Sequence, residues 1–140
     1  MAGGKFRAAS DATLALETGV DRWLALLTTL PTHEDGTGLV EVTGGAYARV
    51  KVNATVDWSA VTTLADKLTR QTGINADKSF PEATAAWGTV VGWALFDAVT
   101  AGNKRRWGVL EDGSGNPTSQ AVSSGTTFTL AANTASISEA

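Results

Sequence analysis

The stretch FPEATAAWGTVVGWALFDAVTAGNKRRWGVL, residues 80–110, decides the predicted fold. It contains two apolar runs, residues 89–96 and 105–110, which are separated by the turn-rich residues 97–104. Ala101, Gly102 and Asn103 lie in this connection, and glycine and asparagine tolerate the positive φ angles that turns need. The pattern predicts a β-hairpin with a loop of several residues.

Alternate residues of the first run point to opposite faces of a strand, and both sets are apolar. Trp93 lies in one set and Phe96 in the other, so the strand is expected to be central and covered on both sides. The second run alternates less cleanly, because Arg105 shares a face with Trp107. We predict a sandwich core that contains Trp87, Val91, Trp93, Leu95, Phe96 and Trp107.

Two segments nearer the N-terminus also predict strands. Residues 22–29 (RWLALLTT) form a short apolar run that is followed by Pro31, and its length favours a buried strand over a helix. Residues 47–56 alternate most cleanly in the chain, with the alanines and valines on one face. Tyr47, Arg49 and Lys51 lie on the other face, which is expected to be polar and solvated.

The remaining elements are shorter. Residues 57–73 carry apolar side chains at helical spacing and predict a short surface helix. Residues 74–80 predict an edge strand, and residues 119–122 and 126–130 predict a last hairpin. Ser10 could cap a short helix that ends near Leu16.

These elements predict one all-β domain. About eight short strands at this turn spacing indicate a jelly-roll-like antiparallel β-sandwich with extended terminal arms. We predict an N-terminal arm at residues 1–20, a β-sandwich domain at residues 21–130 and a C-terminal tail at residues 131–140.

Composition excludes several classes of function. The formal net charge of −3 argues against a nucleic-acid binder, which would need a broad basic surface. The chain has no cysteine, so disulfides and thiolate metal sites cannot hold the fold. No apolar window is long enough to span a membrane, and the N-terminus lacks the pattern of a secretion signal. We expect a soluble protein made in the cytoplasm, with neither nucleic acid nor membrane as partner.

Catalysis is not expected either. The single histidine, His33, lies next to Glu34 and Asp35 in a loop, where a solvated charge cluster is the more common interpretation. A serine triad would also need a nucleophile turn, and no G-x-S-x-G element occurs. The loop that follows Asp112 lacks the spacing of a calcium site. We predict a non-enzymatic protein without cofactor or metal.

Several segments together resemble a family of tailed-phage virion proteins. They are LALLTTLPT (24–32), GLVEVTGGAYAR (38–49), residues 80–110 and SSGTTFTL (123–130). Members of this family are described as head cement (decoration) proteins or as tail-fibre proteins. The length and the jelly-roll expectation are most similar to the head cement protein of a short-tailed phage. The resemblance is weakest at the N-terminal arm and at residues 57–78.

The resemblance implies a capsid cement protein that binds across major capsid protein subunits and stabilises the DNA-filled head. Its place would be the outer surface of the phage head, and a homodimer is preferred over a trimer. We predict that seven residues contact the capsid protein or a second copy of the chain: Lys5, Phe6, Arg7, Arg49, Lys51, Arg105 and Arg106.

The alternative is a tail-fibre or baseplate module that binds a host receptor or carbohydrate. It predicts a trimer and an exposed aromatic platform, with Trp58 or Tyr47 as the candidates. A lectin-like domain unrelated to capsids is a third interpretation.

Overall fold

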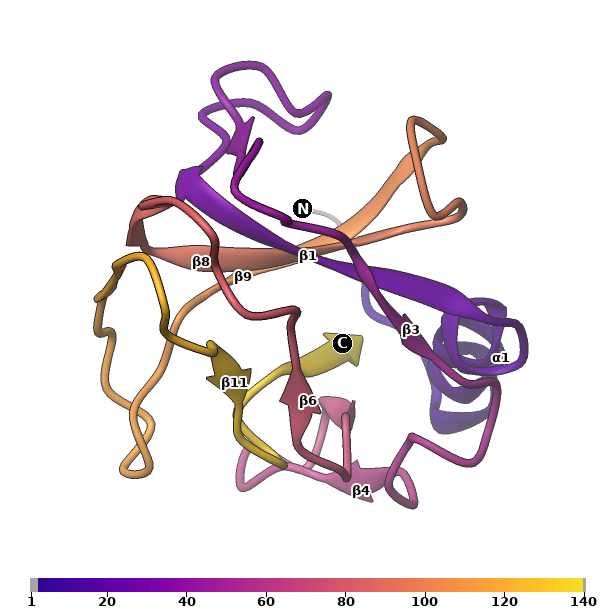
Figure 1. Ribbon diagram of the computed structural model, residues 1–140. Coiled ribbons are helices and arrows are strands. Elements are labelled where there is room, and N and C mark those ends of the chain that lie inside the picture. Colours follow the sequence, from indigo (N-terminus) through magenta and orange to yellow (C-terminus); the bar gives the residue numbers. More distant parts are fainter. Residues whose placement is uncertain (1–2, 140) are drawn as a thin grey trace.

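The structure, a computed structural model, describes residues 3–139, and apart from one helix its regular elements are antiparallel strands (Figure 1). The one helix of these residues is α1 (Arg7–Thr18). Antiparallel sheets face each other in a sandwich-like arrangement, so the predicted all-β class is confirmed. No helix in this range is long and apolar enough to cross a membrane.

The largest sheet is built around β1 (Arg22–Thr29) and β8 (Gly92–Phe96). These two strands pair from Trp23 opposite Phe96 to Leu27 opposite Gly92. On the outer sides, β9 (Lys104–Val109) pairs with β8, whereas β2 (Val40–Glu41) and β3 (Val50–Val52) pair with β1. The predicted strand 22–29 and the predicted hairpin around residues 97–104 are both confirmed.

The opposite layer consists of short ladders. In these, β10 (Gln120–Val122) pairs with β7 (Gly88–Val90), and β11 (Thr129–Leu130) pairs with β6 (Lys78–Ser79). A third ladder has the order β12 (Ser136–Glu139), β5 (Arg70–Gly73), β4 (Thr62–Thr63). Figure 1 shows β4, β6 and β11 below the large sheet, with the core between the two layers.

Side chains from both layers meet in one large apolar cluster. Trp93 and Leu95 enter it from β8, and Phe128 and Ile137 enter it from the opposite layer. The predicted core residues Trp87, Trp93, Leu95 and Phe96 are buried, as expected. Val91 is only half-buried, because it lies at the break between β7 and β8.

Trp107 is the core residue that was predicted wrongly, since 49% of it is exposed. It pairs with Ala94, and directly opposed residues of two strands lie on the same face. Ala94 belongs to a second, smaller apolar cluster on the outer face of the sheet, with Ala25, Leu27 and Phe96. Trp107 therefore points away from the main core, to a face that only loops cover.

The connection between β8 and β9 forms a closed turn. The Asp97 carboxylate accepts hydrogen bonds from the Asn103 backbone N–H at 2.7 Å and from its side-chain amide at 2.8 Å. Ala101 and Gly102 adopt positive φ angles of 50° and 76°, as the sequence predicted for this loop. A Cβ atom on Gly102 would lie 2.5 Å from the Asp97 carboxylate, so the turn has no room for a side chain there.

The helix predicted within residues 57–73 is wrong. This segment forms the hairpin of β4 and β5 instead. Asp66 stabilises its turn by accepting hydrogen bonds from the backbone N–H groups of Leu68 and Thr69, both at 2.9 Å. Leu68 is 73% exposed, so the apolar spacing that suggested a helix does not mark a buried face.

The predicted last hairpin is also wrong. Residues 120–122 and 129–130 pair with β7 and β6, not with each other. The inward orientation expected for Phe128 and Leu130 is correct, since both are buried. The alternation predicted for residues 126–130 is therefore correct, but the strands that pair with β10 and β11 lie far away in the sequence.

Both ends of the described chain pack on the sandwich and are not extended arms. Helix α1 buries Ser10, Leu14 and Glu17 along one side and packs against β5 and β12. Strand β12 lies within the segment predicted as a tail. Phe6, not Ser10, is the N-cap of α1, and it makes no side-chain capping bond. Residues 1–2 and 140 of the predicted arm and tail lie outside the described residues, and the division into arm, domain and tail stays a prediction.

Candidate binding site

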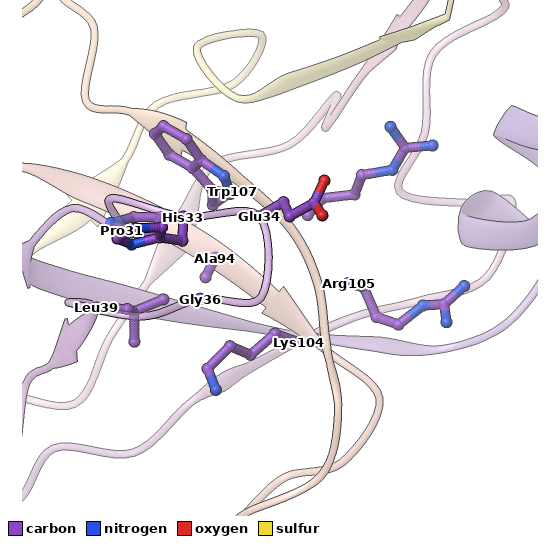
Figure 2. Close-up of a pocket in the computed structure, with 10 residues that line it drawn as sticks. Pro31, His33, Glu34, Gly36, Leu39, Ala94, Lys104, Arg105 and Trp107 are labelled. Atoms are coloured by element: carbon purple, nitrogen blue, oxygen red, sulfur yellow. The ribbon is translucent and has the colours of Figure 1, made fainter.

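A small cavity of about 60 Å³ lies on the outer face of the large sheet, between β8, β9 and the loop of residues 31–39 (Figure 2). Trp107 lines it from β9, and Ala94 lines it from β8. Its lining is completed by Pro31, His33, Glu34, Gly36, Leu39, Lys104, Arg105 and Arg106. We call this the Trp107 pocket.

Trp107 lies in the pocket because of the pairing between β8 and β9. Its cross-strand partner Ala94 is small, so it leaves the Trp107 ring without a large neighbour on that face. The next residue, Gly108, faces the opposite side, where a Cβ atom would lie 2.5 Å from the Trp93 ring. The hairpin thus holds one tryptophan inside the core and presents the other to solvent.

Internal hydrogen bonds fix the loop of residues 31–39 that covers the pocket. Thr32 donates to the Thr37 carbonyl through its backbone N–H at 2.8 Å and through its hydroxyl at 3.0 Å. Asp35 accepts from the Thr37 hydroxyl at 2.6 Å and from the Thr37 N–H at 2.9 Å. The hydrogen bond from the Thr37 hydroxyl is the main reason that the pKa of Asp35 lies below its ordinary value. The rim of the pocket is therefore formed before any ligand binds.

Three polar side chains at the rim can contact a ligand. The imidazole Nδ1 of His33 lies 2.9 Å from the Thr32 hydroxyl, which orients the ring. Within residues 3–139, neither Glu34 nor Lys104 forms an ion pair. Lys104 packs its aliphatic stem against Gly36, where a Cβ atom would lie 2.5 Å from the lysine Cδ. A flat aromatic ring beside unpaired polar groups is typical of a surface that binds a polar ligand.

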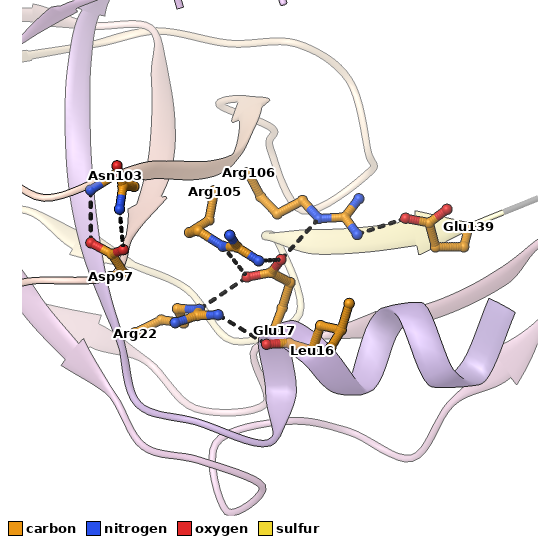
Figure 3. A network of polar contacts seen from close by, with 8 residues as sticks. All are labelled: Leu16, Glu17, Arg22, Asp97, Asn103, Arg105, Arg106 and Glu139. Atoms are coloured by element: carbon orange, nitrogen blue, oxygen red, sulfur yellow. Dashed lines mark hydrogen bonds and ion pairs between the residues drawn. The ribbon is translucent and has the colours of Figure 1, made fainter. Parts of the chain in front are cut away.

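A polar network anchors the cationic side of the pocket to the helix (Figure 3). Glu17 of α1 accepts hydrogen bonds from Arg22 at 2.9 Å and from Arg105 at 2.9 and 3.2 Å. Arg106 donates to Glu139 of β12 at 2.6 Å. Burial alone would raise the pKa of Glu17, but its bonds to Arg105 and Arg22 outweigh burial and hold that pKa below its ordinary value.

The predicted contact residues Arg105 and Arg106 are thus engaged within the chain. Their carboxylate partners, Glu17 and Glu139, lie 88 and 33 residues away in the sequence. No local pattern connects residues so far apart, so sequence reasoning missed this network. Arg105 and Arg106 nevertheless line the Trp107 pocket.

Arg49 was predicted on a solvated face, and this is wrong. Its guanidinium donates to both carboxylate oxygens of Glu41 at 2.8 and 2.9 Å and to the carbonyls of Ala98 and Ala101 at 2.9 and 2.7 Å. It also lies 3.6 Å from the centre of the Phe96 ring. Arg49 therefore joins the 97–103 loop to the sheet and is not free for a partner.

The remaining predicted contact residues lie on two different surfaces. Lys51 is exposed and forms an ion pair with Asp21 at 2.9 Å. Lys5, Phe6 and Arg7 lie together at the start of α1, and all three are exposed. The structure thus separates Lys51 from the N-terminal group, and whether either surface binds a partner stays a prediction.

Neither Trp58 nor Tyr47 forms the exposed aromatic platform that the alternative interpretation predicted. Trp58 is only 7% exposed. The Tyr47 ring packs against Phe80 and Trp87, and its hydroxyl donates to Glu41 at 2.7 Å. Trp107, which was assigned to the core, is the half-exposed aromatic residue at a cavity. In the run of residues 105–110, Arg105 on the same face as Trp107 was the sequence signal that this face is exposed to solvent.

Groups with catalytic chemistry are not brought together around His33. Its hydrogen-bond partner is Thr32, whereas the Asp35 carboxylate is held by Thr37. Among residues 3–139, no cluster of three or more histidine, cysteine, aspartate or glutamate side chains could hold a metal ion.

Comparison with known families supports a phage origin. A family model described as "Podophage GP4 fiber I protein gp80" matches residues 12–138, which is most of the chain, and no curated protein matches. The match includes the residues that line the Trp107 pocket and, in the polar network, Glu17, Arg22, Arg105 and Arg106; it ends one residue before Glu139. It agrees with the wider virion family that the sequence resembles, although its description names a fibre and not a head decoration protein. The chain belongs to the podophage GP4 fiber I protein gp80 family and is a structural protein of a bacteriophage virion.

Proposed function

We propose that this chain is a non-enzymatic module of a phage fibre that binds a carbohydrate of the host surface through the Trp107 pocket. The family description supports a fibre over a head decoration protein. The single observation that carries the binding site is the half-exposed Trp107 ring beside a rigid loop with unpaired polar side chains.

The size of the pocket defines the mode of binding. Pockets that enclose a small ligand usually measure about 300–1,000 Å³. A cavity of about 60 Å³ can accept one substituent of a sugar, while the ring of that sugar lies against the face of Trp107. Such a contact is weak in one copy, and several copies on one virion raise the overall affinity through effective concentration.

The experiment compares Trp107→Ala with Phe6→Ala in binding to host cells. Both residues are exposed aromatics, but only Trp107 lines the pocket. We expect fluorescently labelled Trp107→Ala protein to lose about 2 kcal/mol of binding free energy, as for an interface tryptophan, and Phe6→Ala protein to bind like wild type. Saturation-transfer NMR with purified host polysaccharide should show transfer to the sugar protons from wild type and from Phe6→Ala, but not from Trp107→Ala.

Retained binding by Trp107→Ala would contradict the carbohydrate site. The head-cement role, the outer-head location and the capsid-protein partner stay predictions. Saturable binding of the purified protein to expanded empty heads, with no binding to host cells, would favour them over the fibre. The oligomeric state also stays a prediction: light scattering would give a trimer for the fibre interpretation and a dimer for the cement interpretation.

A further inference from the structure

A second surface lies where the start of α1 meets the turn between β4 and β5. A hollow of about 120 Å³ is lined there by Lys5, Phe6, Arg7, Thr63, Lys67, Leu68 and Arg70. The residues from 5 to 7 and from 63 to 70 are far apart in the sequence, so only the fold creates this surface. We call it the Phe6 corner.

Two large apolar side chains are exposed to solvent at this corner. Phe6 is 92% exposed and Leu68 is 73% exposed, so both side chains can bury apolar surface in a complex. Neither position is loose. Phe6 is the N-cap of α1, where its carbonyl accepts from the N–H groups of Ala9 and Ser10 at 3.0 and 3.1 Å. Leu68 follows Lys67, whose positive φ of 61° is held by the Asp66 turn.

The charge at the corner is one-sided. Four of the seven lining residues are cationic and none is acidic, although the chain as a whole has a net charge of −3. Lys5 is paired with Glu139 at 2.7 Å, and Arg70 is paired with Asp11 at 2.8 Å.

Arg7 and Lys67 are left without an ion pair in the part of the chain that the structure describes. The neighbouring Asp66 carboxylate keeps its negative charge while it accepts hydrogen bonds from Leu68 and Thr69. The four cations of the corner therefore outnumber the carboxylates of Glu139, Asp11 and Asp66 by one. Asp11 lies close enough to Arg7 to feel its charge, but its hydrogen bonds go to Arg70.

We propose that the Phe6 corner docks an acidic segment of another virion protein, with an apolar side chain of that segment inserted between Phe6 and Leu68. A virion protein must contact other proteins of the particle, and the excess positive charge selects an acidic partner. The two apolar anchors distinguish such a segment from a small anion, which would use the cations alone. The corner is separate in its residues from the Trp107 pocket, so it accounts for attachment independently of host binding.

The test measures how many copies enter the particle. A phage that lacks the gene is complemented with single variants, and copies per purified particle are quantified by mass spectrometry. Arg7→Glu and Lys67→Glu should each lower the copy number about tenfold, and Leu68→Ser should lower it similarly. The matched controls are Thr127→Glu, which adds a glutamate at an exposed position outside the corner, and Val56→Ser, which replaces an apolar residue that is 75% exposed. Both controls should retain the wild-type copy number.

Thermal melts of the purified variants separate docking from folding, because these exposed positions should leave the melting temperature unchanged. Wild-type copy numbers for Arg7→Glu and Lys67→Glu would overturn the proposal. The proposal would also be overturned if light scattering showed that wild type self-associates and Lys67→Glu does not, because a second copy of the chain would then occupy the corner. Binding of wild type, but not Arg7→Glu, to phosphatidylglycerol vesicles would overturn it in favour of a membrane surface.

Discussion

The two faces of the β8–β9 hairpin differ more than their sequences suggest. On the inner face, Trp93 is only 3% exposed and packs against Gly108. On the outer face, Trp107 is 49% exposed beside a loop and charged side chains. The same residue type serves stability on one face and is available for recognition on the other. The difference is set by register: one tryptophan is opposite a glycine in the core, and the other is opposite an alanine at the surface.

The largest expected effect is at the inner face. Trp93→Ala should lower the free energy of unfolding by about 3–5 kcal/mol, because it empties the centre of the main cluster. Urea denaturation followed by the remaining tryptophans would measure this loss. A variant that does not fold at all agrees with the prediction, whereas a loss under about 1 kcal/mol would show that the inner face is not the stabilising one.

On the outer face, the polar side chain of Arg49 also stabilises the fold. Arg49→Ala leaves Glu41 with the Tyr47 hydroxyl as its remaining donor, removes the donor of two loop carbonyls and should cost about 2–4 kcal/mol. Lys51→Ala, which removes an exposed ion pair two residues further along the chain in β3, should cost less than about 1 kcal/mol. Chemical denaturation of both variants tests the contrast, and equal losses would contradict the structural role of Arg49.

Glu17 links the outer face to the helix and gives the fold a dependence on pH. Because its folded pKa lies below the unfolded value of about 4.3, the ionised carboxylate stabilises the fold above that pH. The contribution is lost as the pH falls through the folded pKa. Glu17→Gln should therefore cost about 2 kcal/mol at pH 7, and the difference from wild type should shrink toward pH 3.

The exposed Glu34 provides the matched control for this experiment. Glu34→Gln should change stability by less than about 0.5 kcal/mol at either pH. Denaturation curves of wild type and both variants at the two pH values separate the outcomes. A Glu17→Gln difference that grows on acidification would contradict the sign of the pKa shift.

The central sheet could be predicted from sequence because its signals are local. Residues 22–29 and 92–96 are continuous apolar runs, and the loop between β8 and β9 has residues suited to positive φ. The pairing in the opposite layer could not be predicted, because strands such as β6 and β11 are two residues long and their partners lie far away in the sequence. Their pairing is decided by tertiary packing.

The candidate site was predicted only in part, for a related reason. The face that Trp107 occupies depends on its register with β8, and the pairing is irregular between Leu95 and Phe96. The alternation of residues along β9 alone does not show on which face of the sheet Trp107 lies. The arginines of the site were recognised as candidates, but their acidic partners lie on α1 and β12. Ion pairs at such separations leave no periodic pattern in the sequence.

Apart from the control variants, the smallest expected effect on stability is at Trp107, and this variant sharpens the comparison most. Trp107→Ala should cost at most about 1 kcal/mol of unfolding free energy, because the ring is half-exposed and its partner Ala94 remains covered by Leu27 and Phe96. If Trp107 serves recognition, the same variant should lose host binding while its urea midpoint stays close to that of wild type. A large loss of unfolding free energy would instead indicate that Trp107 is a core residue, as the sequence predicted. The pair of tryptophans then separates the two roles: Trp93→Ala unfolds the protein, and Trp107→Ala leaves a folded protein that no longer binds.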